Sequence, residues 1–225
     1  PKETFAQMKT SRLRVDSRHP VFELTHKMAH EGFLGTDFDF QSTEFSFQKR
    51  FWLNVMGHAD VNLSVGKVWT KNTPYTFLFM PNANTGYTIQ DNSFSQLQSM
   101  EFVYDQYAQW NICWRMMGLI FNNTPLLRRL KWREVVSFRG VYGKLSEQND
   151  PYAMNLDGTF KNPTLYEFPS NGQVYRLGNE PYMEAAFGIE NIFKMVRVEY
   201  IRRLNYLDHP GVSKHGFQIA VHFGF

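Results

Sequence analysis

The segment FQIAVHFGF, residues 217–225, indicates the fold most clearly. Every second side chain in it is apolar: Phe217, Ile219, Val221, Phe223 and Phe225. The residues between them are small or polar. A period of two is the period of a β-strand, whose successive side chains point to opposite faces. The segment therefore predicts a strand with one apolar face and one face of different character.

The same alternation recurs upstream of this segment. It is found near residues 22–25, 45–51, 59–66, 108–116, 136–143, 183–190 and 196–201. Leu13 and Val15 fit the end of a further strand, and only residues 93–102 offer a weak amphipathic helix. We therefore predict an all-β protein with about eight strands of about ten residues each.

The composition narrows the class of protein. The chain has 225 residues and a net charge of +3, a mild excess that does not by itself indicate nucleic-acid binding, and we expect no nucleic-acid partner. Its one cysteine excludes an intrachain disulfide framework and a thiolate zinc site. Its mean hydropathy is −0.43. The longest apolar run, Met116–Phe121, is far shorter than the roughly 20 residues of a transmembrane helix. Yet 16% of the residues are aromatic, so the fold must use aromatic side chains without long apolar runs.

Two all-β architectures fit this pattern. One is a secreted or periplasmic β-sandwich that acts as a binding module, with one wet face on each sheet. The other is a transmembrane antiparallel up-and-down β-barrel of the outer membrane, in which an apolar band faces lipid and the lumen is polar. The strand length, the charges on the alternate face and the alternation of short and long connections favour the barrel. We therefore predict the barrel and keep the sandwich as the alternative.

Two charged residues share the apolar parity and test this prediction. Arg202 would lie near one edge of the apolar band, where an arginine costs about 0–1 kcal/mol. Lys49, between Phe47 and Phe51, would either extend its amine towards the interface or mark a β-bulge that reverses the parity.

The final segment, residues 181–225, resembles the end of a Bacteroidota outer-membrane β-barrel family whose members carry an N-terminal carboxypeptidase-regulatory-like domain. It reads PYMEAAFGIENIFKMVRVEYIRRLNYLDHPGVSKHGFQIAVHFGF. Residues 19–40 (HPVFELTHKMAHEGFLGTDFDF), 100–111 (MEFVYDQYAQWN) and 118–136 (GLIFNNTPLLRRLKWREVV) resemble the same family, in order. The barrel of that family is longer than this chain. The resemblance therefore implies that residues 1–225 are the C-terminal part of such a barrel and a fragment of a larger one. By strand count alone, a closed barrel of eight strands is the alternative.

The last strands carry a second, more distant resemblance. The pattern GIE…VRVEY within residues 186–200, with a terminal aromatic residue, resembles the penultimate hairpin of the outer-membrane assembly and translocation barrels. In outer-membrane proteins generally, a last strand that ends in an aromatic residue resembles the signal read by the barrel-assembly machinery. By position, this signal would comprise Phe217, Ile219, Val221, Phe223 and Phe225. The alternative is that these side chains only face lipid.

Candidate functional residues follow from the parity of the strands. Charges on two neighbouring predicted strands share the inner face, where they could form cross-strand ion pairs that fill the lumen or a selectivity or gating surface. These are Glu184, Glu190, Arg197, Glu199 and Arg203. Aromatic residues near strand ends suit a girdle at the membrane interfaces. The candidates are Trp69, Trp132, Tyr142 and Tyr206.

The sequence contains no recognised catalytic motif, and we expect neither a metal nor a cofactor. His222 could act as the base of a barrel hydrolase, but nothing in the sequence selects a nucleophile for it. We expect a non-enzymatic integral outer-membrane protein with a role in transport, translocation or outer-membrane assembly. The expected partners are outer-membrane lipid, the barrel-assembly machinery during biogenesis and other outer-membrane or periplasmic proteins.

Overall fold

The protein is built around one large antiparallel sheet. The structure, a computed structural model, describes residues 4–7, 12–15, 19–32, 35, 38–169 and 174–221, and at 4–7 and 12–15 it describes the backbone alone. The sheet has eight strands in the order β12-β11-β10-β8-β7-β5-β4-β3. They are β3 (Val21–Ala29), β4 (Phe40–Trp52), β5 (His58–Val68), β7 (Gln106–Arg115), β8 (Arg133–Lys144), β10 (Tyr182–Ile192), β11 (Val196–Arg203) and β12 (His215–Val221). The predicted all-β class and the eight predicted strands are confirmed.

The remaining elements are short. β1 (Thr4–Gln7) pairs antiparallel with β2 (Arg12–Val15), and β6 (Phe102–Val103) pairs parallel with β9 (Tyr175–Arg176). The described residues also form four single turns of 3₁₀ helix: η1 (Asn54–Met56), η2 (Tyr75–Phe77), η3 (Phe121–Asn123) and η4 (Leu127–Arg129). Residues 93–102 form no helix. Among the described residues, no helix is long and apolar enough to cross a bilayer.

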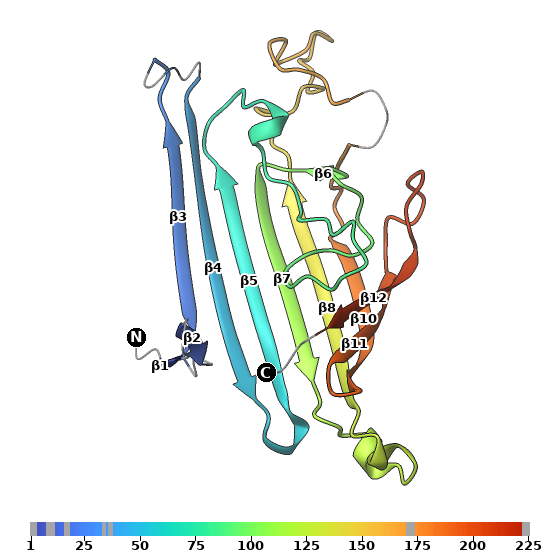
Figure 1. The fold of residues 1–225 in the computed structure, drawn as a ribbon. Helices are drawn as coiled ribbons and strands as arrows, with labels where there is room; N and C mark the ends of the chain where they lie inside the picture. Colours follow the sequence, from blue (N-terminus) through green and yellow to red (C-terminus); the bar gives the residue numbers. More distant parts are fainter. Residues whose placement is uncertain are drawn as a thin grey trace.

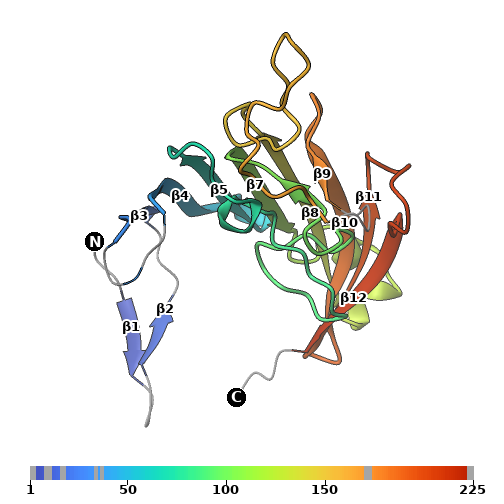
Figure 2. The same ribbon diagram turned by 90° about the horizontal axis from the view of Figure 1, so that it is seen from above.

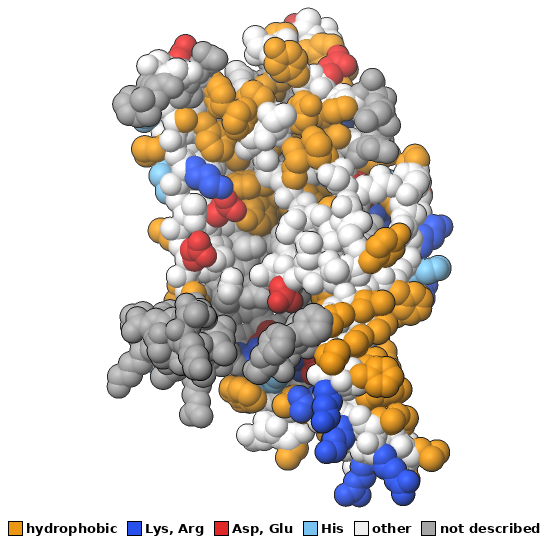
Figure 3. Space-filling model, in the orientation of Figure 1, with side chains coloured by type: hydrophobic (Ala, Val, Ile, Leu, Met, Phe, Trp, Pro, Cys, Tyr) orange, Lys and Arg blue, Asp and Glu red, His pale blue; other side chains and the backbone are white. Residues whose placement is uncertain are grey.

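The connections divide between the two ends of the sheet. Residues 53–57, 116–132 and 193–195 join strands at the lower end in Figure 1. The described parts of the other connections lie at the upper end, namely residues 30–32, 35, 38–39, 69–105, 145–169, 174–181 and 204–214. This is the predicted alternation, except that residues 116–132 form a longer connection because they include η3 and η4. Lys and Arg side chains gather at the lower end (Figure 3).

The two faces of the sheet differ as the alternation predicts. One row of cross-strand neighbours on the outer face runs through seven strands and is almost wholly apolar. It consists of Phe51, Ala59, Trp114, Val136, Phe187, Tyr200 and Phe217. The β4–β5 register is continuous from Ser42 to Trp52, so no bulge reverses the parity at Lys49. Lys49 lies on the outer face with its amine 4.8 Å from the ring centroid of Phe51.

The sheet curves but does not close into a barrel, which corrects the alternative of a closed barrel of eight strands. Seen from above in Figure 2, it is an arc with β3 and β12 at its two ends. The physical reason lies in the hollow of the arc. The connection of residues 69–105, which we call the inner loop, folds back against the inner face (Figure 1). A closed eight-stranded barrel has an interior just wide enough for side chains, and this hollow holds a stretch of backbone as well.

The apolar core of the described residues lies in this hollow, between the inner loop and the upper parts of β8 and β10. The inner loop contributes Phe94, Leu97 and Phe102, which pack with Val141 of β8 and Tyr182 of β10. Phe94 and Tyr182 meet edge to face at 5.4 Å between ring centroids. The inner loop is therefore a packed part of the fold and shares its core with the sheet.

Candidate functional site in the polar interior of the sheet

The inner face of β8, β10 and β11 carries a set of buried charged side chains. Alternation places Arg139, Glu184, Arg197, Glu199 and Arg203 on this face, and each is at most 5% exposed. A buried charge is costly unless it is paired and hydrogen-bonded. The contacts of these side chains therefore show what the interior is built to hold.

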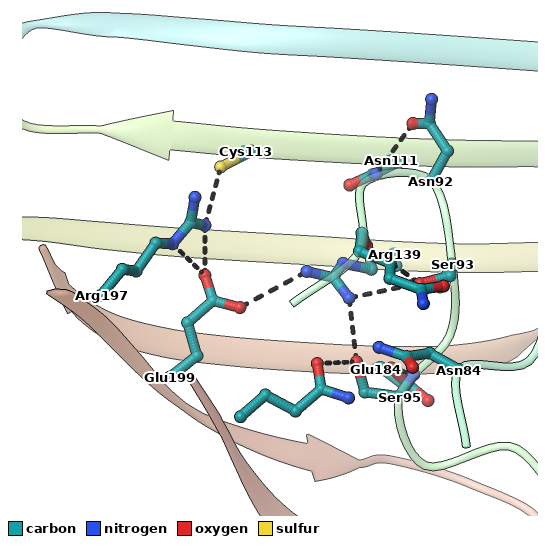
Figure 4. Close-up of polar contacts among 12 residues, drawn as sticks. Asn84, Asn92, Ser93, Ser95, Asn111, Cys113, Arg139, Glu184, Arg197 and Glu199 are labelled. Atoms are coloured by element: carbon teal, nitrogen blue, oxygen red, sulfur yellow. Dashed lines mark hydrogen bonds and ion pairs between the residues drawn. The ribbon is translucent and has the colours of Figure 1, made fainter. Parts of the chain in front are cut away.

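Glu199 of β11 lies at the centre of one group of contacts (Figure 4). Arg197, two residues earlier on the same strand, forms an ion pair with its carboxylate and donates a hydrogen bond to the sulfur of Cys113. Arg139 of β8 approaches the second carboxylate oxygen at 3.5 Å. The other terminal guanidinium nitrogen of Arg139, Nη1, donates to the carbonyl oxygen of Ser93, at 3.0 Å. Arg139 thus links the sheet to the inner loop.

Glu184 of β10 binds the backbone of the inner loop. Its two carboxylate oxygens accept hydrogen bonds from the backbone N–H groups of Ser95, at 2.9 Å, and Gln96, at 2.7 Å. The hydroxyl of Tyr182 donates a third, at 2.7 Å. Hydrogen bonds to an ionised acceptor are about twice as strong as neutral ones. Glu184 is therefore a fixed anchor for the loop, and its side chain is only 1% exposed.

Arg203 of β11 makes the most buried ion pair of the described interior. Its guanidinium donates to both carboxylate oxygens of Glu101, at 2.6 and 3.0 Å, and both side chains are fully buried. It also donates to the carbonyl oxygens of Asn205 and Tyr206, and His209 Nδ1 lies 2.8 Å from Glu101. Burial by itself raises the pKa of the Glu101 carboxyl, but the hydrogen bonds from Arg203 and His209 outweigh it, so the pKa is lowered overall.

Glu190 lies apart from these groups, near the lower end of the sheet. Its carboxylate is 3.6 Å from Nε of Arg115, and Arg115 also forms an ion pair with Asp60. Arg50 binds the same aspartate, at 2.6 Å. Asp60 and Arg115 line a polar cavity of about 580 Å³ between the sheet and the inner loop, to which Asn111 also contributes.

The five predicted charges therefore all lie on the inner face, but they do not form one cross-strand network. Glu184 and Arg203 are direct neighbours in the β10–β11 register. They nevertheless do not pair with each other, because each binds the inner loop: Glu184 binds Gln96 and Arg203 binds Glu101. The sequence-based reasoning missed Glu101 and Tyr182 as partners and did not include Arg139 in the cluster. Strand parity placed Arg139 on the inner face. Glu101, in contrast, lies in a connection without any periodic signal.

The other predicted residues are placed as follows. Phe217, Ile219 and Val221 lie on the outer face of β12 and are 65%, 47% and 49% exposed. Phe223 and Phe225 lie outside the described residues, as does His222.

The four candidate girdle residues do not share one environment. Trp69 and Tyr142 lie at the upper end of the outer face, where both line one shallow groove. Trp132 directly precedes β8 at the lower end, with its ring against Phe121. Tyr206 packs against the inner core beside Phe102, and its hydroxyl donates to the carbonyl oxygen of Glu180.

No group of three or more His, Cys, Asp or Glu side chains suited to hold a metal ion occurs within the described ranges. The contacts of the interior are ion pairs and hydrogen bonds that attach a loop to a sheet. These contacts can hold the inner loop in the hollow of the curved sheet and so seal it. Detachment of the loop would open the hollow.

Comparison with known families gives one match. Residues 1–153 match the family model described as the C-terminal domain of a family of unknown function, DUF5686. The match stops before residues 181–225, the segment whose resemblance to outer-membrane barrels is most specific. No curated protein matches the chain.

Proposed function

Because the chain belongs to the DUF5686 family, whose function is unknown, we propose a role from the geometry of its sheet: it is the C-terminal part of an integral outer-membrane β-barrel. Its role is non-enzymatic and lies in transport, translocation or outer-membrane assembly. The observation that carries this proposal is the contrast between the two faces of one continuous sheet. Apolar neighbours cover the outer face across seven strands, and buried charges line the inner face.

The outer face supports the proposal because it leaves large apolar side chains uncovered. Phe45, Leu63, Ile112, Phe138 and Phe187 belong to different strands, and each is 36–46% exposed. An apolar surface that extends over a whole sheet is unusual for a protein surrounded by water. Lipid would cover it without any further protein.

The inner face argues against the alternative of a β-sandwich. Sheets pack face to face through apolar, interdigitating side chains. Here the buried inner face carries Arg139, Glu184 and Glu199, and the inner loop covers it instead of a second sheet of comparable size. A sandwich would have to pack on the outer face, and the described residues contain no second large sheet.

Membrane insertion requires a closed sheet, because lipid cannot satisfy the backbone groups of an edge strand. Among the described residues, β3 has a partner only in β4. We therefore propose that strands outside this sequence complete the barrel between β3 and β12, as in a larger Bacteroidota-type barrel. Lipid and the barrel-assembly machinery are then partners, and the exposed outer face of β12 fits the proposed assembly signal.

The inner loop defines what the interior does under this proposal. It is attached by Arg139, Glu184 and Arg203, so it plugs the lumen on the side of β8 to β11. A cargo that crosses the barrel would have to displace this loop or pass through the polar cavity beside it. The charged residues therefore serve to hold a plug, which is a gating role.

The test is the behaviour of the purified protein in detergent. A folded barrel migrates faster on a denaturing gel before boiling than after it, and it aggregates when detergent is removed. We expect both for the protein with its complete barrel. A protein that stays monodisperse in buffer without detergent, with the same migration before and after boiling, would overturn the proposal.

A further inference from the structure

A row of polar side chains borders the upper end of the outer face. The strand registers place Thr43, Lys67, Gln106 and Lys144 side by side on β4, β5, β7 and β8. The two lysines are separated by one strand. Because neighbouring strands lie about 4.8 Å apart, their backbones are about 10 Å apart. Two long, flexible amines can therefore converge on one group above Gln106.

An apolar groove spans this row: Trp69 lies above the row, and the other apolar lining residues lie below it. It has a volume of about 470 Å³ and is lined by Phe45, Val65, Ala108, Tyr142 and Trp69, together with parts of the polar row. Phe45, Val65, Ala108 and Tyr142 form the next cross-strand row on the same face. Ala108 is the smallest of them, so the floor of the groove is lowest there.

The charges at the mouth of the groove are not held in ion pairs with described residues, although Glu147, which pairs with Lys161, lies within electrostatic reach of Lys144. In the part of the chain that the structure describes, neither Lys67 nor Lys144 belongs to an ion pair. The amine of Lys67 lies 4.5 Å from the ring centroid of Trp69. The indole N–H of Trp69 donates to the hydroxyl of Thr43, at 2.9 Å, which fixes the ring. A positively charged mouth above an apolar groove matches a molecule with an anionic head and an acyl chain.

We propose that this groove binds a phosphate-bearing membrane lipid. Its phosphate lies between Lys67 and Lys144, and one acyl chain runs down the groove over Ala108 between Phe45 and Tyr142. This inference rests on the proposed membrane function, because it needs the outer face to meet lipid. Lysine binds phosphate as a point charge and needs no fixed geometry, which suits a headgroup at the edge of a bilayer. A free phosphate ion would leave the apolar groove empty.

The experiment uses the full-length protein purified in an uncharged maltoside detergent. Native mass spectrometry counts the phosphatidylglycerol molecules that the protein retains, in competition with an uncharged diacyl glycolipid of the same chain length. We expect preferential retention of phosphatidylglycerol, weakened about 30-fold in the variant that combines Lys67→Ala and Lys144→Ala. Ala108→Leu, which fills the groove, should weaken retention of both lipids. Lys49→Ala removes a lysine of the same face at its other end and serves as the matched control.

Each other outcome overturns the inference. Equal retention by the double variant and the wild type would show that the two lysines hold no headgroup. Displacement of the lipid by inorganic phosphate alone would show a simple anion site. Heat-modifiable migration is measured on the same samples, and it reports the barrel independently. If the wild type shows no lipid preference but keeps its heat-modifiable migration, the lipid site alone is refuted. Absence of heat-modifiable migration in the wild type refutes the proposed function.

Discussion

Replacing Leu63 by arginine distinguishes an outer face that meets lipid from one that meets water. Leu63 lies on the outer face of β5, is 42% exposed, and has Phe47 and Trp110 as its cross-strand neighbours. From His58, the first residue of β5, to Leu63 the chain climbs about 12 Å along the membrane normal, at roughly 3.3 Å per residue and a tilt of about 45°. That is about half of an apolar band about 25 Å tall. Leu63 would therefore lie near the middle of the bilayer.

The expected cost follows from this depth. An arginine on the lipid face costs about 2–4 kcal/mol at the midplane and about 0–1 near an interface. Leu63→Arg should therefore lower the folding equilibrium constant in a bilayer by about 30-fold to several hundred-fold. The matched control is Val55→Arg in η1, at the lower end of the sheet, where Val55 is 86% exposed. It should change the free energy of unfolding by less than about 1 kcal/mol.

The assay is urea-induced unfolding of the protein folded into lipid vesicles, with the folded fraction read from the heat-modifiable band. If water covered the outer face, Leu63→Arg would be an ordinary surface substitution, with an effect within about 0.5 kcal/mol. Equal unfolding midpoints for Leu63→Arg and Val55→Arg would therefore refute the assignment of this face to lipid. Leu63→Met, which keeps the volume and the apolar character, checks that any loss comes from the charge.

Three further predictions concern the interior. Arg203→Met leaves the buried carboxylate of Glu101 unpaired, so it should lower the free energy of unfolding, measured by thermal unfolding, by about 3–5 kcal/mol. The control is Arg202→Met, on the outer face of the same strand, which should change the free energy of unfolding by less than about 1 kcal/mol, as at a surface site. The pKa of Glu101 is lowered in the folded protein, so the stability that its carboxylate contributes is fully present above the ordinary pKa of 4.5 and is lost as the pH falls through the folded pKa. When the free energy of unfolding is measured against pH in the acid range, Glu101→Gln should reduce this loss. An unchanged dependence on pH would contradict the assignment of this loss to Glu101. Glu184→Ala removes the acceptor of two backbone N–H groups, so the rate of amide hydrogen exchange should increase in residues 93–98 while the strands stay protected. An unchanged exchange rate in residues 93–98 would show that the carboxylate does not anchor the inner loop.

The sequence was sufficient to place side chains on faces, because a period of two is a property of each strand alone. The outward position of Phe187 and the inward position of Glu199 could both be predicted from their own segments. The β-bulge considered at Lys49 could not be excluded in this way. Its exclusion required the register with β5, and register depends on the neighbouring strand.

The partners of the interior charges could not be predicted for a different reason. Parity places Glu184 and Arg203 on the same face of adjacent strands, where two opposite charges would be expected to pair, and the register makes them direct neighbours. The inner loop changes this outcome because it brings its own donors and acceptors into the hollow. Glu101 competes for Arg203, and the N–H groups of Gln96 and its neighbour compete for Glu184. Loop contacts over such long separations leave no periodic signal in the sequence.

The inner loop also affects β12, the edge strand at which the proposed barrel would close. The backbone N–H and C=O groups of Ile219 in β12 point away from β11, and both form hydrogen bonds with the inner loop. Its N–H donates to the carbonyl oxygen of Tyr87, at 2.9 Å, and its carbonyl oxygen accepts from the N–H of Ile89, at 3.1 Å. A further strand cannot pair with β12 at this point while residues 87–89 remain there. The same loop is held to the sheet by Glu184 and Arg139, so closure of the barrel at β12 and the position of the plug are physically coupled. A barrel completed by further strands must either displace residues 87–89 or keep a gap in its hydrogen bonds beside Ile219, and such a gap would be the weakest seam of the barrel wall.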